Sequence, residues 1–425
     1  MSKNVFITLL KREVVPAIGC TEPIAVALAA ATAARALGYQ AESLDVAVSA
    51  NLLKNGMGVI VPGCGEMGLH IAAAAGAIGG KSELGLECLR DIDEDLAQKA
   101  KAMVAADKVN LHLPDNEDLL YCKVIASGNS HTGAAELKDT HTNITRIWKD
   151  GAIISEKIEE KTAEEKQEEW PLTVAKIFEF ANTTPLEEIS FILEAAAMNR
   201  KVAEEGLQRH YGLSVGRNID EQVRKNILAD DMQTFATRLT AAAADARMAG
   251  VQMPVMSNSG SGNQGITCTM PVVACAIRLD KNDGELARAL IMSHLISIHI
   301  KHHLGRLSAH CGAMVAGTAS ACGIAHLMGG DLNVMERTIR NMVGNIAGMI
   351  CDGAKSSCAL KVASAVGAGI QSAMLALEGI AVPGNEGIVS DDIEVCIANL
   401  GVLGSTGMRE TDKVILDIML HKKQA

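Results

Sequence analysis

The stretch HTNITRIWKDGAIISEKIEEKTAEEKQEEWPLTVAKIFEFA, residues 141–181, contains the change of pattern that decides the fold. Its first part alternates apolar and polar residues around Asp150-Gly151, which predicts a β-hairpin. Residues 155–169 form a run of charged residues, typical of a solvated linker or an exposed helix start. The pattern that follows is helical. The sequence therefore predicts an α+β protein whose strands precede this charged run and whose large helical domain follows it.

The segments before and after the charged run also differ in their predicted secondary structure. Upstream, residues 43–61 and 109–154 have strand patterns, whereas residues 5–37 have helical spacing. Downstream, nearly every segment is predicted to be helical. We therefore expect three parts: N-terminal helices in 1–40 that pack on the helical domain, a small α/β lobe with a short antiparallel sheet in 41–165, and a large all-helical domain in 166–425.

The amino-acid composition indicates what kind of core the protein has and what kind of partner it binds. Apolar residues make up 48% of the 425 residues and aromatic residues only 2%, so we expect a core of closely packed helices rich in small residues. The net charge of −11 argues against a nucleic-acid partner, which would require basic stripes or stacking platforms. A small-molecule partner fits better. The oligomeric state stays open, with a homo-oligomer as one alternative.

The sequence also predicts a cytoplasmic protein without a membrane partner. The first residues lack the pattern of a secretion signal. The longest uncharged run, residues 307–330, contains histidines, serines and glycines and is predicted to be a buried helix, not a membrane span. The eleven cysteines are odd in number and follow no export signal, so we expect them to be reduced.

A glycine-rich loop, SNSGSGNQG at 257–265, interrupts the helical half. Its glycines match G-x-G-x-x-G, but a dinucleotide site requires flanking strands, and the flanking patterns here are helical. Such a turn at a helix start exposes backbone N–H groups to an anion, for example a substrate carboxylate. An ordinary interhelical loop is the alternative. The candidate binding residues are Ser257, Asn258, Ser259 and Gly260.

Three cysteines mark two further breaks: Cys311 in LSAHCGAM, and Cys351 and Cys358 in MICDGAKSSCAL. A single cysteine is more often a packed core residue. However, the Asp-Gly and Ser-Ser pairs between Cys351 and Cys358 are difficult to explain by packing. Cys322 would lie about 16 Å beyond Cys311 along one helix, so only one of the two can belong to the same centre. Cys311, at the helix start, is the better candidate.

Two metals suit these thiols. Zinc is one, because four histidines lie near in the sequence: His299, His302, His303 and His310. No C-x₂-C pair supports a structural zinc site. Three thiolates without an obvious fourth protein ligand suggest instead an iron–sulfur cluster with one open iron, which could act as a Lewis acid.

Near the N-terminus, AIGCTEPIA places Cys20 in a polar triplet just before a proline. This triplet conflicts with the surrounding alanine-rich helical pattern, and such local conflicts are typical of functional sites.

Two polar patches in the small lobe supply further candidate binding residues: Asn51, Lys54 and Asn55 in NLLKNGMG, and His141 in HTN. Turn chemistry or a cross-strand partner explains these residues at least as well.

Seven motifs spread over nearly the whole chain carry a family resemblance. They are GCTEPIA at 19–25, NLLKNGMGVIVPG at 51–63, HTNI at 141–144, ADAR at 244–247, MSNSGSGNQGI at 256–266, MICDGAKSSCALKV at 349–362 and GNEGIV at 384–389. Together they resemble the L-cysteine desulfidase family. The helical half is also similar to the α chain of the iron–sulfur-dependent bacterial L-serine dehydratases.

The resemblance implies a 4Fe–4S cluster in the helical domain, which would then be the catalytic domain, with Cys311, Cys351 and Cys358 as ligands. It also implies that Cys20 is an active-site residue and that the loop 257–265 belongs to the substrate pocket. The expected activity is α,β-elimination of L-cysteine to pyruvate, ammonia and hydrogen sulfide. A serine dehydratase-type lyase and a non-catalytic cluster sensor are the alternatives. Cys20 could transfer protons or be a fourth cluster ligand. Three other cysteines match no motif and are expected in the core: Cys268, Cys275 and Cys322.

Overall fold

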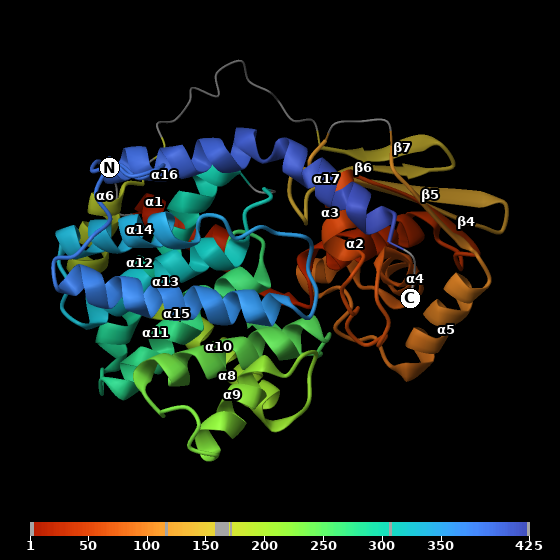
Figure 1. Ribbon diagram of the computed structural model, residues 1–425. Helices are drawn as coiled ribbons and strands as arrows, with labels where there is room; N and C mark the ends of the chain where they lie inside the picture. The colour runs from red at the N-terminus through yellow and green to blue at the C-terminus, as the bar shows by residue number, and fades with distance from the viewer. Residues whose placement is uncertain (1–3, 115–117, 158–169, 171, 306–307, 423–425) are drawn as a thin grey trace.

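The smaller part of the molecule is built on a sheet of six strands in the order β3-β2-β4-β5-β6-β7 (Figure 1). The computed structural model describes residues 4–114, 118–157, 170, 172–305 and 308–422. The strands of this sheet are β2 (Ser43–Val48), β3 (Val109–His112), β4 (Tyr121–Gly128), β5 (His131–Lys138), β6 (Ile144–Lys149) and β7 (Ala152–Glu156). Neighbouring strands are antiparallel, except that β3 runs parallel to β2 after a helical crossover.

The turn that the sequence predicted between the last two strands is present. Asp150 and Gly151 join β6 to β7, with φ values of 49° and 80°. Positive φ at both central residues is the geometry that favours Asp-Gly in two-residue hairpins.

Helices α2 (Thr21–Leu37), α4 (Leu69–Gly79) and α5 (Glu94–Ala105) belong to the same part. We expected the N-terminal helices to pack on the helical domain. Instead, α2 packs against α4 and the sheet, and its alanines form the centre of the smaller core. The preceding helix, α1 (Asn4–Glu13), contributes Phe6, Leu9 and Leu10 to the larger helical core.

The larger part is helical, which together with the sheet confirms the predicted α+β class (Figure 1). Its central helix, α13, packs against α11, α12, α14 and α15. The helices are α6 (Val174–Thr183), α7 (Leu186–Ile189), α8 (Leu193–Gln208), α9 (Val215–Arg224), α10 (Met232–Met248), α11 (Gly262–Arg278), α12 (Asp283–Leu304), α13 (Gly312–Leu327), α14 (Leu332–Ile346), α15 (Cys358–Leu377), α16 (Ile393–Val402) and α17 (Arg409–Leu420). Short turns are η1 (Ser82–Glu87), η2 (Ser190–Ile192) and the π-helical η3 (Leu403–Gly407).

One helix within the described ranges, α15, is long and apolar enough to cross a membrane by length and composition alone. It packs against α10, α13 and α14. The uncharged run at 307–330 contains the buried helix that the sequence predicted, which begins at Gly312.

Two local predictions were wrong. Residues 5–37 are interrupted by β1 (Pro16–Ile18), which pairs antiparallel with β8 (Pro254–Met256). The strand pattern predicted for 43–61 holds for β2 only, and the segment after it is a helix, α3 (Ala50–Gly56). Most of the charged run, residues 158–169, lies outside the described residues.

Candidate active site

A small cavity lies where the two parts of the molecule meet. Its volume of about 90 Å³ exceeds the roughly 10–15 Å³ that one water molecule requires, so it has room for a small ligand. The smaller part contributes Cys20, Thr21, Glu22 and Asn55 to its lining. The helical part contributes Arg247, Ser261, Asn263, Cys311, Gly312, Ala313, Cys351, Gly353, Ala354, Cys358 and Val362.

Four of the described helices begin at this cavity. The N-caps of α2, α11 and α13 are Cys20, Ser261 and Cys311, and α15 begins at Cys358 itself. The first N–H groups of a helix have no partner within the helix, and its macrodipole places partial positive charge there. Four such ends around one cavity favour an anionic occupant.

Two of the three predicted metal-binding thiols are placed by a short antiparallel bridge between His310 and Ile350. Cys311 N donates to Met349 O at 2.9 Å, and Cys351 N donates to Ala309 O at 2.6 Å. Side chains alternate across such a pair, so Cys311 and Cys351 share one face while His310 lies on the other.

The third thiol completes the group at the start of α15. Cys358 Sγ accepts from Lys355 N at 3.5 Å, so the loop 351–358 turns back on itself. Burial, together with the neighbouring Cys351 and Cys358, raises the pKa of Cys311 to about 12. Burial also raises the pKa of Cys358. A cationic centre bound beside Cys311 and Cys358 would favour their thiolates.

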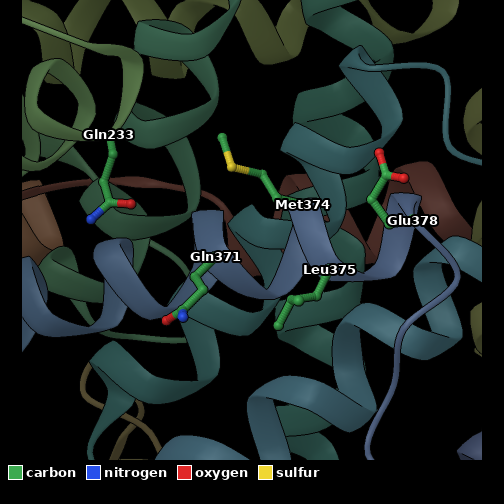
Figure 2. Close-up of a pocket in the computed structure, with 5 residues that line it drawn as sticks. All are labelled: Gln233, Gln371, Met374, Leu375 and Glu378. Atoms are coloured by element: carbon green, nitrogen blue, oxygen red, sulfur yellow. The ribbon is translucent and has the colours of Figure 1, made fainter.

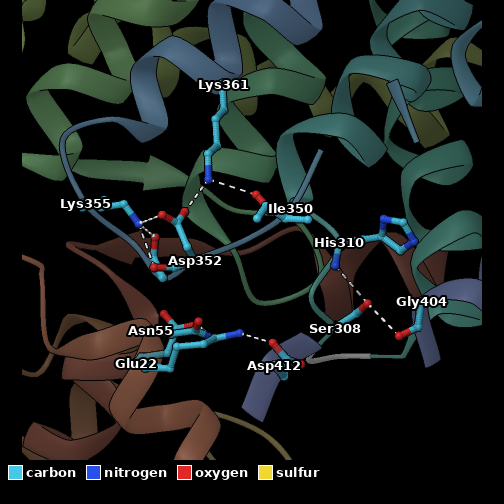
Figure 3. A network of polar contacts seen from close by, with 12 residues as sticks. Glu22, Asn55, Ser308, His310, Ile350, Asp352, Lys355, Lys361, Gly404 and Asp412 are labelled. Carbon is cyan, nitrogen blue, oxygen red and sulfur yellow. Dashed lines mark hydrogen bonds and ion pairs between the residues drawn. The ribbon is translucent and has the colours of Figure 1, made fainter. Parts of the chain in front are cut away.

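Two lysines hold this loop in shape (Figure 3). Asp352 accepts from Lys355 Nζ at 2.6 Å and from Lys361 Nζ at 2.5 Å. Lys361 Nζ also donates to Ile350 O at 2.9 Å. Burial alone would raise the pKa of Asp352, but the two ammonium groups outweigh it and lower the pKa to about 2. The loop is thus fixed by an ionised carboxylate next to the thiols.

These residues fit an iron–sulfur cluster better than a zinc ion. Within the described ranges, no three or more His, Cys, Asp or Glu side chains are grouped to hold one metal ion. The three thiols instead surround a shared cavity, which suits a cluster because its thiolates bind different irons. Two histidines of the zinc alternative have other partners: His299 contacts Trp170 and Glu394, and His302 stacks on Trp170. Both ring nitrogens of buried His310 are without a hydrogen-bond partner among the described residues, but His310 does not line the cavity. Cys322 lies in the core of α13, away from the cavity.

Cys20 and Glu22 form a hydrogen-bonded pair that lines the same cavity as the thiols. Cys20 Sγ donates to Glu22 Oε2 at 2.9 Å, and Asn55 Nδ2 donates to Glu22 Oε1 at 3.4 Å. Burial would raise the pKa of Glu22, but His141, the Cys20 hydrogen bond and Arg247 outweigh it, so the pKa is lowered. Burial and then Glu22 raise the pKa of Cys20 well above its ordinary value. The pair is therefore a protonated thiol held by an ionised carboxylate.

Arg247 is a buried cation at the end of α10, and only 3% of it is exposed. Its Nη1 donates to Asn263 Oδ1 at 3.0 Å, while its Nε has no hydrogen-bond partner among the described residues. No carboxylate in the described part of the chain forms an ion pair with it. Gly262 permits this position, because a Cβ there would lie 2.2 Å from Arg247 Nε. A buried guanidinium in this state suits an anionic ligand.

The structure brings together some of the residues predicted from the sequence. Cys20, Asn55 and the three predicted metal-binding cysteines line the cavity. The other predicted binding residues do not line it: Asn51, Lys54, His141, Ser257, Asn258, Ser259 and Gly260. Lys54 pairs with Asp412 of α17, and His141 Nε2 lies 3.9 Å from Glu22 Oε1, behind the cavity wall.

The polar side chains at the start of the glycine-rich loop are used inside the protein. Ser257 Oγ donates to Val15 O at 2.6 Å. Asn258 Nδ2 contacts His294 Nδ1 at 3.0 Å, and its Oδ1 accepts from Gln264 Nε2 at 3.1 Å. These bonds fix the loop beside β1. The expected helix start at the end of this loop does reach the cavity, through Ser261 and Asn263.

Sequence reasoning missed Glu22 and Arg247 as site residues. Both residues lie in motifs quoted above, Glu22 in GCTEPIA and Arg247 in ADAR, so the sequence could have identified them as candidates. Their burial could not be predicted locally, because it results from the packing of α2 and α10.

A larger hollow, of about 460 Å³, lies on the outer surface of α15 (Figure 2). Its lining residues are Gln233, Gln371, Met374, Leu375 and Glu378, side chains that supply neither a thiol nor a cation. The cavity between the two parts is the better candidate site.

Comparison with known proteins yields one family and several close relatives. Residues 83–417 match the family model described as "Serine dehydratase alpha chain". A UPF0597 protein of Oleidesulfovibrio alaskensis is 59% identical over 419 residues, which cover 98% of each chain. A UPF0597 protein of Bacteroides fragilis is 46% identical over 98% of this chain and 97% of its own. A UPF0597 protein of Aeromonas salmonicida is 46% identical over 99% of this chain and 96% of its own.

If the cavity holds an iron–sulfur cluster, the geometry predicts which cysteines bind it. Anaerobically reconstituted protein should carry about four irons per chain, the content of a 4Fe–4S cluster. Cys311→Ala, Cys351→Ala and Cys358→Ala should each lose this iron and its visible absorption, because a methyl group cannot replace a thiolate. Cys322→Ala and Cys268→Ala should keep the iron and the absorption, because replacing a thiol that only packs in the core costs about 1–2 kcal/mol of stability. Zinc in place of iron, or a colourless Cys322→Ala protein, would contradict this assignment.

Proposed function

Because this chain belongs to the serine dehydratase alpha chain family, we propose that it is an iron–sulfur-dependent lyase acting on L-cysteine. The products would be pyruvate, ammonia and hydrogen sulfide. One observation carries the proposal: three thiols, a buried arginine and the Cys20–Glu22 pair line a single cavity at which four helices begin. Such a site can bind a small zwitterion and move a proton within it.

Cys311, Cys351 and Cys358 would hold a 4Fe–4S cluster, which when bound supplies a Lewis-acidic iron for the substrate and its leaving group. The positive ends of α13 and α15 would offset its negative charge. The loop 351–358, held by Lys355 and Lys361 through Asp352, would keep two of the thiols in place.

The polarity of the lining matches an α-amino acid. Arg247 offers a buried guanidinium for the carboxylate. Asn55 Oδ1, which is buried and has no hydrogen-bond partner in the described residues, offers an acceptor for the ammonium group. Glu22 provides a second negative group on the same side. A ligand bound between them would satisfy polar atoms that are costly to leave unpaired.

Cys20 and Glu22 would handle the Cα proton. Glu22 accepts the hydrogen bond of Cys20 Sγ, so it can take the thiol proton as Sγ receives the proton from Cα. Elimination then breaks the Cβ–S bond and releases hydrosulfide and aminoacrylate. Aminoacrylate tautomerises and is hydrolysed by water to pyruvate and ammonium without help from the protein.

The wall near Cys20 favours cysteine over serine. Cys20, Val59 and Met248 form a buried apolar cluster against which Ala354 and Cys358 pack. A thiol loses little on entering such surroundings, whereas a hydroxyl would require a hydrogen-bond partner. L-serine is the second candidate substrate, and the description of the matched family favours it.

The proposal is tested by anaerobic assay of reconstituted protein with L-cysteine and with L-serine. We expect pyruvate and sulfide in equal amounts from L-cysteine, and a lower kcat/KM for pyruvate formation from L-serine. Exposure to air should abolish both activities, because an open iron lacks a thiolate that shields it. Faster turnover of L-serine would make the second candidate the substrate. No pyruvate from either amino acid, with the cluster intact, would favour a sensor.

Arg247→Met should reduce kcat/KM for L-cysteine by about 30-fold or more, because loss of a buried charged partner costs at least about 2 kcal/mol. The iron content should not change. Arg217→Met is the matched control, since Arg217 lies on α9 and pairs with Glu221 away from the cavity. Equal kcat/KM values for the two variants would argue against carboxylate binding by Arg247.

Cys20→Ala and Cys20→Ser should keep the iron and the visible absorption but lose turnover. Loss of a proton-transfer group typically costs about a hundred- to ten-thousand-fold. Cys64→Ala is the control, because Cys64 is buried in the same part of the molecule but does not line the cavity. If Cys20 is instead the fourth cluster ligand, the absorption of the Cys20 variants will change. An intact cluster with normal turnover would refute both roles.

A further inference from the structure

The C-terminal helix α17 leaves the helical part and lies against α3 of the smaller part (Figure 1). The residues of its inner face recur every three or four positions, as expected of an amphipathic helix on a surface. The buried and half-buried residues of this face are Thr411, Asp412, Ile415, Leu416 and Met419. The helix therefore connects the two parts whose boundary forms the cavity.

An ion pair between Lys54 and Asp412 fastens α17 to α3. The Lys54 side chain is 2% exposed and that of Asp412 is 16% exposed. Lys54 precedes Asn55 in α3, and Asn55 Nδ2 donates to Glu22 Oε1 at 3.4 Å, so the ion pair adjoins the cavity residues of the smaller part (Figure 3). A lysine buried to this degree depends on its counter-ion.

The same turn of α3 contacts the loop between two of the predicted cluster ligands. Ala354 N donates to Asn55 O at 3.3 Å. Gly353 has φ 90°, and a Cβ there would lie 2.3 Å from Lys54 O and 3.5 Å from Met419 Cε. Helix α17, α3 and the loop 351–358 thus meet at one point.

The start of the same C-terminal segment reaches the other side of the site (Figure 3). Ser308 Oγ donates to Gly404 O at 3.1 Å and accepts from His310 N at 3.2 Å. His310 precedes Cys311. Gly404 belongs to the π-helical turn η3, and such turns are frequent at functional sites. The segment 403–420 therefore contacts the surroundings of all three thiols.

We propose that residues 403–420 form a strap that holds the two parts closed over the cavity, and that Lys54 and Asp412 are its positioning pair. The strap keeps Asn55 and Glu22 against the loop 351–358, although neither Lys54 nor Asp412 lines the cavity. Its effect on elimination rests on the proposed function. Its effect on closure does not, so the two can be tested separately.

Closure is measured on the iron-free chain by the rate at which iodoacetamide labels each cysteine, followed by mass spectrometry. Asp412→Asn leaves Lys54 buried without its counter-ion, which favours opening. We expect Cys20, Cys311, Cys351 and Cys358 to be labelled about tenfold faster or more. Cys268 and Cys322, which are fully buried in the helical core, should be labelled at the wild-type rate.

Two further variants control this result. Glu410→Gln changes a residue of the same helix whose side chain is 78% exposed, and it should label like the wild type. The double variant Lys54→Met with Asp412→Leu replaces the ion pair by an apolar contact, which buried pairs usually tolerate, and it should restore protection. Unchanged labelling in Asp412→Asn, or equal acceleration at Cys268 and Cys322, would overturn the strap.

In the reconstituted enzyme, Asp412→Asn should lower kcat/KM for L-cysteine by about a hundredfold through misplacement of Asn55 and Glu22. The iron content should stay at the wild-type value, and the double variant should recover activity. Wild-type protein that does not turn over L-cysteine would refute the proposed function and leave the labelling result to decide the strap. Normal kcat/KM in a variant with accelerated labelling would refute the positioning role.

Discussion

The positive ends of four of the described helices, α2, α11, α13 and α15, meet at one buried cavity, and this arrangement constrains the rest of the structure. Partial positive charge out of water must be offset by negative charge nearby. Glu22 is ionised at this place although burial opposes it. Cys311 and Cys358 do not offset the helix ends in the free protein, because burial raises the pKa of both thiols. A cluster of bound thiolates would complete the charge balance.

Much of this site could be predicted from the sequence, because some of its polar residues stand in segments whose pattern is otherwise that of a packed core. Polar residues between Cys351 and Cys358, and the polar triplet at Cys20 in an alanine-rich helix, have no use in a packed core, and both places line the cavity. The same signal at Ser257 and Asn258 has a second explanation. Their polar side chains form hydrogen bonds to Val15 and His294, which lie elsewhere in the sequence.

The features that the sequence did not predict are set by tertiary contacts. Strand β1 has three residues, too few for a period-two pattern, and it exists because β8 pairs with it. Helix α3 contains two asparagines and a glycine, which are poor helix formers, and its buried Lys54 pairs with Asp412, which lies 358 positions later in the sequence. Arginines at helix ends are usually exposed, so nothing local identified Arg247 as a buried cation.

The two kinds of chemistry at the cavity come from different parts of the molecule. The matched family model begins at residue 83, after Cys20, Glu22 and Asn55, and includes Arg247 and the three predicted cluster ligands. Under the proposed mechanism, proton transfer and metal binding therefore depend on the relative position of two separately packed cores. Misplacement of a reacting group by about 1 Å can lower the rate a hundredfold. A site shared between two cores therefore requires contacts that fix one core relative to the other. The strap at 403–420 supplies one from the helical side, and the β1–β8 pair supplies the other from the N-terminus.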